Sequence, residues 1–146
     1  MSTNPPSSSD STSLPPSPFQ TTAALLAHLY ADLTRLSSVS APYIRLHTAD
    51  RDLFTPPKPP LIGIAAAQAH EENLIAATGG TLVMDVQSIT ANEDFGCVLG
   101  VLRATKEGRG DLAVPFCGVW RFEGGWAVEH WENARGVEEF VRWLGE

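Results

Sequence analysis

One carboxylate, Glu129, lies among aromatic residues in the last third of the chain. Two apolar segments, 113–122 and 126–132, flank Glu123-Gly124-Gly125, and glycine tolerates the positive φ of a tight turn, so this stretch predicts a β-hairpin. With a two-residue turn at Gly124-Gly125, alternation puts Glu129 on the same face as Phe116, Trp120, Phe122 and Trp131. Apolar surroundings raise the pKa of a carboxyl and let it act as an acid or base near neutrality. We therefore predict that this face lines a cavity.

This prediction has two alternatives. Glu129 is solvated, or a one-residue change of register exchanges Glu129 with His130.

His47 is the predicted catalytic partner of Glu129, because an imidazole titrates in the range that general acid–base chemistry uses. Asp50 follows three residues later and is the candidate that orients the ring. Both residues also fit structural roles, as a packed histidine and as the cap of a helix or turn. The predicted proton-transfer pair is therefore His47 and Glu129, with Asp50 supporting it.

Three more polar side chains are candidates for contact with a substrate. Tyr43 can donate a hydrogen bond to a carbonyl, although a place in the core also explains it. Arg103 ends an apolar strand, where it holds a carboxylate or oxyanion or simply lies exposed. Asp85 interrupts another apolar strand, either as a second acid or on the outer face of an edge strand. The aromatic residues predicted to shape the substrate are Phe116, Trp120 and Trp131.

Length, charge and composition limit the class of protein. The chain has 146 residues, 43% of them hydrophobic, a formal charge of −7 and a pI of about 5.0. These values predict one globular domain and argue against a nucleic-acid or membrane partner, because neutralising phosphates requires a basic face. No segment has the ~18 apolar residues of a membrane span, and no secretory signal is recognisable. We expect a cytoplasmic protein.

No cofactor motif is recognisable in the sequence. It has no phosphate-binding loop, nucleotide-binding glycine pattern, nucleophile elbow or metal-spaced cluster. Cys97 and Cys117 are interpreted as small buried hydrophobic residues of two separate strands. His28 and His70, on predicted helices, have no carboxylate at matching spacing. We expect neither a cofactor nor a metal.

The N-terminal half is predicted to be a tail followed by helices. Residues 1–18 are rich in Ser, Pro and Thr and are expected to be disordered, which leaves 19–146 as the folded domain. Leucines at helical spacing predict a helix over 21–36, and Thr21 or Thr22 can cap it. The following residues, 37–60, are expected to be irregular, with a short turn of helix near 41–46.

A second helix is predicted over 64–78, because this alanine-rich stretch ends at Gly79-Gly80. Its residues 70–72, His-Glu-Glu, are expected on the solvent side. Four antiparallel strands and a short closing helix follow, over 81–90, 97–104, 113–122, 126–132 and 137–144. Segregated helices and strands predict an α+β fold, with a curved antiparallel sheet wrapped around N-terminal helices as a cone-shaped barrel with an internal cavity.

The final hairpin carries a family resemblance. Residues 120–131, Trp-Arg-Phe-Glu-Gly-Gly-Trp-Ala-Val-Glu-His-Trp, resemble the closing hairpin of SnoaL-like proteins, whose pattern is roughly aromatic-Arg-Phe-x-x-Gly-x-Ile-x-Glu-His-Trp. These proteins belong to the nuclear-transport-factor-2-like superfamily of cone-shaped α+β barrels. Residues 44–47 followed by Gly63, and the tail 140–145, are similar to further segments of the family, so the resemblance spans about residues 20–145.

The resemblance implies an enzyme of specialised metabolism, with His47 at the mouth of its cavity. Polyketide-cyclising members carry an aspartate a few residues after Glu-His-Trp, whereas here residues 132–136 read Glu-Asn-Ala-Arg-Gly and lack it. This departure favours another reaction on the same scaffold.

We therefore predict a cofactor-independent acid–base enzyme, an isomerase, cyclase, dehydratase or epoxide hydrolase, acting on a small apolar metabolite. The alternative is a non-catalytic small-ligand-binding or dimerisation module of the same fold. A homodimer formed through the outer face of the sheet is also expected.

Overall fold

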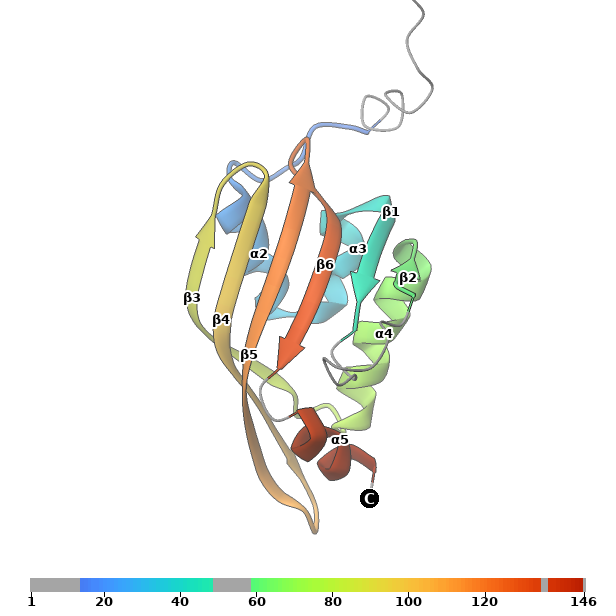
Figure 1. Ribbon diagram of the computed structural model, residues 1–146, viewed down its shortest axis with the longest axis vertical. Helices are drawn as coiled ribbons and strands as arrows, with labels where there is room; N and C mark the ends of the chain where they lie inside the picture. Colours follow the sequence, from blue (N-terminus) through green and yellow to red (C-terminus); the bar gives the residue numbers. More distant parts are fainter. Residues whose placement is uncertain (1–13, 49–58, 135–136, 146) are drawn as a thin grey trace, which may run out of the picture.

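The computed structural model describes residues 14–48, 59–134 and 137–145 (Figure 1). The elements in chain order are α2 (Thr22–Ala31), η1 (Leu33–Arg35), α3 (Leu36–Val39), β1 (Ser40–His47), β2 (Leu61–Ile62), α4 (Ile64–Ala77), β3 (Val83–Ala91), β4 (Phe95–Lys106), β5 (Gly110–Glu123), β6 (Trp126–Ala134) and α5 (Val137–Gly145). No helix among these residues is long and apolar enough to cross a membrane.

Within the described residues, the strands form one curved, unclosed sheet of six strands in the order β2-β1-β6-β5-β4-β3. Helices α2, α3 and α4 lie together against one side of this sheet, and α5 lies beside the end of the long β4–β5 hairpin (Figure 1). The apolar residues of α2 fill the concave side of the sheet, where Leu25, Leu26 and Leu29 are almost fully buried. The predicted α+β cone of a curved sheet around N-terminal helices is therefore confirmed.

The first helix is shorter than predicted because Asp32 interrupts it. Thr21 caps the start as expected, since its Oγ1 accepts a hydrogen bond from the amide of Ala24 at 3.0 Å. Asp32 then adopts an extended backbone, and its carboxylate accepts a hydrogen bond from the amide of Thr34 at 3.0 Å. Short polar side chains of this kind compete with helical backbone hydrogen bonds, so the chain restarts as η1 and α3.

The region expected to be irregular contains a strand, β1, that was not predicted. β1 pairs in parallel with β6 and antiparallel with β2, so the predicted four-stranded meander is extended by two strands. Ile44 and Leu46 are fully buried while Arg45 between them is exposed, which is the alternation of a half-buried strand. The expected turn of helix near residues 41–46 is therefore wrong.

A β-bulge changes the register of the final hairpin. Phe122 pairs with Ala127 as predicted, but the next residue, Arg121, pairs with Glu129, so Val128 is an extra residue. An inserted residue reverses which side chains face inward beyond it. His130 therefore shares the concave face with Trp120, and Glu129 lies on the outer face.

The described part of the N-terminal tail contacts the turn of this hairpin. The indole Nε1 of Trp126 donates a hydrogen bond to the carbonyl of Pro15 at 2.8 Å, and Ser17 lies over Gly125. Disorder is predicted as far as residue 18, so these contacts differ from that expectation for residues 14–18.

Candidate active-site cavity

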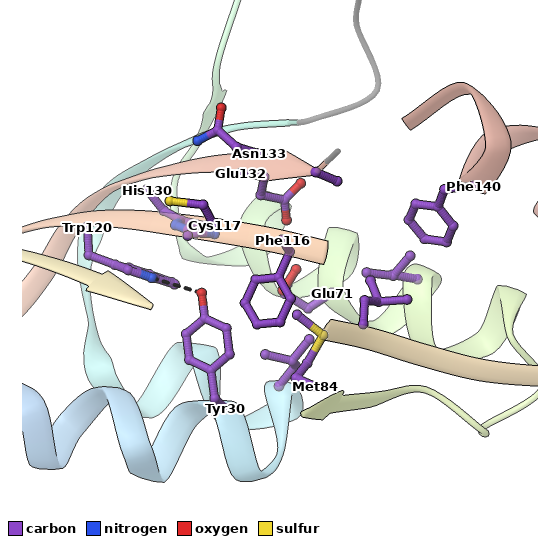
Figure 2. Close-up of a pocket in the computed structure, with 15 residues that line it drawn as sticks. Tyr30, Glu71, Met84, Phe116, Cys117, Trp120, His130, Glu132, Asn133 and Phe140 are labelled. Carbon is purple, nitrogen blue, oxygen red and sulfur yellow. Dashed lines mark hydrogen bonds between the residues drawn. The ribbon is translucent and has the colours of Figure 1, made fainter. Parts of the chain in front are cut away.

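A cavity of about 70 Å³ lies between the concave face of the sheet and helices α2, α4 and α5 (Figure 2). Its wall is mostly apolar, with Leu33, Leu74, Met84, Leu102, Phe116, Ala134 and Phe140. The polar or ionisable residues that line it are Tyr30, Glu71, Cys117, Trp120, His130, Glu132 and Asn133. A volume of this size holds several water molecules or part of a small organic ligand. Of the residues predicted to contact a substrate, Phe116 and Trp120 line this cavity.

Three ionisable side chains meet at one end of the cavity. His70 and Glu71 are consecutive residues of α4, and Glu132 comes from β6. The Nε2 atom of His70 lies 3.0 and 3.2 Å from the two carboxylate oxygens of Glu132. Glu132 and Glu71 are hydrogen-bonded to each other, and Figure 2 shows their carboxyl groups pointing toward one another.

Two carboxyl groups can share a hydrogen bond only when one of them carries a proton. Burial, followed by the nearby charge of Glu132, raises the pKa of Glu71 well above its usual value. Burial also acts on Glu132, but the hydrogen bonds from His70 and Glu71 outweigh it and lower its pKa. Glu71 is therefore the protonated partner and Glu132 the carboxylate. Oε1 of Glu71 is buried and has no hydrogen-bond partner among the described residues.

The same three side chains have donor atoms within 4.8 Å of one another. Histidine and carboxylate ligands at this spacing can share a divalent cation. Here the hydrogen bond between Glu71 and Glu132 places a proton in that position, and a cation would have to displace it.

A tyrosine, a tryptophan and a histidine form the opposite part of the polar wall. The indole Nε1 of Trp120 donates a hydrogen bond to the hydroxyl oxygen of Tyr30 at 3.0 Å (Figure 2). Burial raises the pKa of Tyr30 far above its usual value, so the phenol keeps its proton. The ring of His130 stacks on Trp120 with 3.6 Å between centroids. Gly118 leaves room for the Tyr30 hydroxyl beside these rings, because a Cβ at this position would collide with the hydroxyl oxygen.

His130 is neutral and has one fixed tautomer. Its Nδ1 lies 3.0 Å from the carbonyl oxygen of Val119, and a carbonyl only accepts hydrogen bonds, so Nδ1 carries the hydrogen. Burial lowers the pKa of His130 to about 4, mainly because the charged ring would lose its hydration. The other ring nitrogen, Nε2, is therefore an unprotonated acceptor.

The predicted catalytic pair is in contact but lies on the outer face of the sheet. Nε2 of His47 is 2.7 Å from Oε2 of Glu129, so their predicted proximity is confirmed. The prediction that Glu129 lines the cavity is wrong, because the bulge turns it outward to Arg121, whose Nε donates to it at 3.2 Å. Burial opposes the charge of Glu129, but the hydrogen bonds from His47 and Arg121 outweigh burial and lower its pKa. Trp131 is also on this face and stacks on His47 at 5.3 Å, so its predicted place in the cavity is wrong.

The other candidates that the structure describes do not line this cavity. Arg103 and Asp85 form an exposed ion pair on the outer face, with Nε 3.0 Å from Oδ2, so the interpretation of Asp85 as an outward-facing residue is the one that the structure favours. Tyr43 is half-buried on β1 and is not among the lining residues. Asp50 lies outside the described residues.

The prediction that His70 and Glu71 lie on the solvent side of their helix is wrong. Glu71 is only 5% exposed, because it follows the fully buried Ala67 by four residues and so lies on the same helix face. That spacing was the available signal. A carboxylate on the buried face of a helix is unusual and marks a functional candidate.

Comparison with known proteins identifies the fold. No protein-family model matches the sequence, and no curated protein does. Among solved structures, Bal32a from a soil-derived mobile gene cassette has a TM-score of 0.70 at 19% identity, over 84% of this chain and 95% of that one. A proposed SnoaL-like polyketide cyclase from Jannaschia sp. CCS1 gives 0.66 at 15%, over 91% and 99%. IdmH from Streptomyces antibioticus, a proposed polyketide cyclase, gives 0.63 at 23%, over 86% and 96%.

The chain thus has the cone-shaped α+β fold of the nuclear-transport-factor-2-like superfamily. The resemblance of its sequence to SnoaL-like proteins is confirmed at the level of this fold.

Proposed function

We propose that the protein is a cofactor-independent acid–base enzyme that acts on a small, largely apolar metabolite with an enolisable carbonyl group. The observation that carries this proposal is the hydrogen-bonded pair of Glu71 and Glu132 in an apolar cavity, where Oε1 of Glu71 has no hydrogen-bond partner among the described residues. Perturbed acids of this kind in a cavity are typical of catalytic sites. Structures described as proposed polyketide cyclases share the fold, which supports a role in specialised metabolism.

The geometry supports a proton relay through Glu71. Oε1 of Glu71 takes a proton from the carbon next to the substrate carbonyl, while the proton on its other oxygen moves to Glu132. Nε2 of His70 lies against the Glu132 carboxylate and holds it in place. Return of the proton to a different atom of the substrate completes an isomerisation. Attack by the enol carbon on a second carbonyl of the substrate completes a cyclisation.

Tyr30 is placed to stabilise the negative charge that develops on the substrate oxygen. Its hydroxyl oxygen accepts the hydrogen bond from Trp120, and its own hydrogen has no acceptor within the described part of the chain. Accepting one hydrogen bond makes a hydroxyl a better donor, so Tyr30 can stabilise an enolate in a cavity with little water.

Exchange of carbon-bound hydrogen tests the proposal without knowledge of the native substrate. Wild-type protein and variants are incubated in D2O with a panel of one-ring ketones, such as acetophenone, cyclohexanone and 2-cyclohexenone, and loss of the α-proton signal is followed by NMR. We expect Glu71→Gln and Glu132→Gln to slow exchange at least about a hundredfold, the usual contribution of a general acid or base. The matched control is Glu72→Gln, the same change at an exposed position of α4.

The outcomes separate this site from its alternatives. Exchange that is equal in all variants contradicts the proposal. Loss of exchange in His47→Ala or Glu129→Gln alone would place the chemistry on the outer face. Ketone binding without exchange would favour a ligand-binding module, and sensitivity to EDTA would favour a cation among His70, Glu71 and Glu132.

A further inference from the structure

One hydrogen-bonding atom in the cavity wall is not used by the proposed proton relay. Nδ1 of His130 carries the ring hydrogen and donates it to the carbonyl oxygen of Val119, so Nε2 can only accept a hydrogen bond. No hydrogen bond to Nε2 is formed within the described part of the chain, and His130 lines the cavity. The ring is held flat against Trp120, so this acceptor has a fixed direction.

An unprotonated nitrogen in the wall of a mostly apolar cavity is stabilised when a ligand supplies a hydrogen-bond donor. Glu132, two residues along β6, is already engaged by His70 and Glu71. The Trp120 indole donates to the Tyr30 hydroxyl oxygen, and in the proposed function the hydrogen of this hydroxyl serves the substrate oxygen. A molecule in the cavity can therefore supply the donor that Nε2 lacks.

We propose that the cavity selects an apolar ring compound that carries a hydroxyl group, a phenol or an enol, and that this hydroxyl donates its hydrogen to Nε2 of His130. This inference rests on the proposed function, because it names the substrate class of the same cavity. The aromatic residues on the same wall, Phe116 and Trp120, provide the apolar surface for the ring. His130 is in this view a specificity-determining residue.

Phenol and toluene form the probe pair, because they have nearly the same shape and differ in one hydroxyl. Their dissociation constants are measured by NMR titration for the wild-type protein and for His130→Phe, which keeps a ring against Trp120 and removes the acceptor. We expect the preference for phenol over toluene to fall about tenfold in the variant, the effect of one buried hydrogen bond. The matched control, His28→Phe, changes a histidine that does not line the cavity and should leave the preference unchanged.

A second measurement uses the wild-type protein alone and so does not depend on the folding of a variant. Long-range proton–nitrogen NMR spectra of the histidine rings should show His130 with hydrogen on Nδ1, and its Nε2 resonance should move on addition of phenol but not of toluene. The proposal is overturned if His130→Phe keeps the preference for phenol or if the Nε2 resonance does not shift on addition of phenol. It is also overturned if phenol does not bind at millimolar concentration. Neither probe reacts, so these results stand apart from the exchange assay that tests the proposed function.

Discussion

A Glu71→Gln variant should lose the pH dependence of stability that the proton on Glu71 creates. Gln resembles the protonated carboxyl in shape and charge, and its amide can donate to Glu132 as the acid does. Near pH 4.5, the usual pKa of the group, we therefore expect the variant and the wild type to have similar stability.

The direction in which stability changes with pH follows from the raised pKa of Glu71. Above about pH 4.5 the carboxyl has lost its proton in the unfolded chain but keeps it in the folded protein, so the folded state binds more protons. The contribution of Glu71 to stability is fully present below this pH and is lost as the pH rises toward the folded pKa. One proton gives a slope of at most about 1.4 kcal/mol per pH unit, and Gln has none. The variant should therefore become progressively more stable than the wild type as the pH rises.

Urea unfolding, followed by tryptophan fluorescence between pH 5 and 8, measures this difference. With an m value of about 2 kcal/mol/M, the midpoint of the variant should move ahead of the wild type by up to about 0.7 M per pH unit. Glu72→Gln controls for the change of residue type at an exposed position. A stability difference between Glu71→Gln and the wild type that is flat across this pH range would mean that Glu71 is ionised in the folded protein, and would refute the shared proton.

The other predictions concern packing, surface charge and assembly. Gly118→Ala should destabilise the protein by about 1–3 kcal/mol in urea, because the new Cβ collides with the Tyr30 hydroxyl; an unchanged midpoint would contradict this packing. Arg103→Gln should change stability by less than about 1 kcal/mol and leave ketone exchange unchanged, because its ion pair with Asp85 is exposed. Leu99 is 46% exposed on the outer face, where the sequence predicts a homodimer. Leu99→Glu should then sediment as a 15.7 kDa monomer and the wild type as a dimer, whereas a monomeric wild type would exclude the dimer.

The elements with strong local signals were predictable from the sequence. The glycine pair at 124–125 fixes the turn of the last hairpin, and the first pairs after it, such as Phe122 with Ala127, have the predicted register. The helix predicted over 64–78 is observed at Ile64–Ala77 and ends before Gly79-Gly80. Turn chemistry and helical period depend on neighbours in sequence, so one chain is enough to read them.

Features that depend on distant partners were not predictable in the same way. β1 is a strand because β6, about eighty residues later, offers it a parallel edge, and its own alternation is short and interrupted by Pro42. The bulge at Val128 leaves no clear pattern, because both Ala127 and Val128 are apolar and both are buried. A single inserted residue therefore exchanged the predicted faces of the hairpin beyond it.

The bulge also changes how the missing aspartate of the polyketide-cyclising pattern is understood. In an unbroken hairpin Glu132 would point outward with His130, and the cavity would contain Glu129 as its only acid from this strand. With the bulge, His130 and Glu132 both point inward, and Glu132 meets His70 and Glu71 of α4. An acid is thus present in the cavity although the aspartate is absent from the sequence, and it comes with a second carboxyl that holds a proton. Acid–base chemistry at this site therefore depends on the pair of carboxyl groups, which neither the helix nor the strand supplies alone.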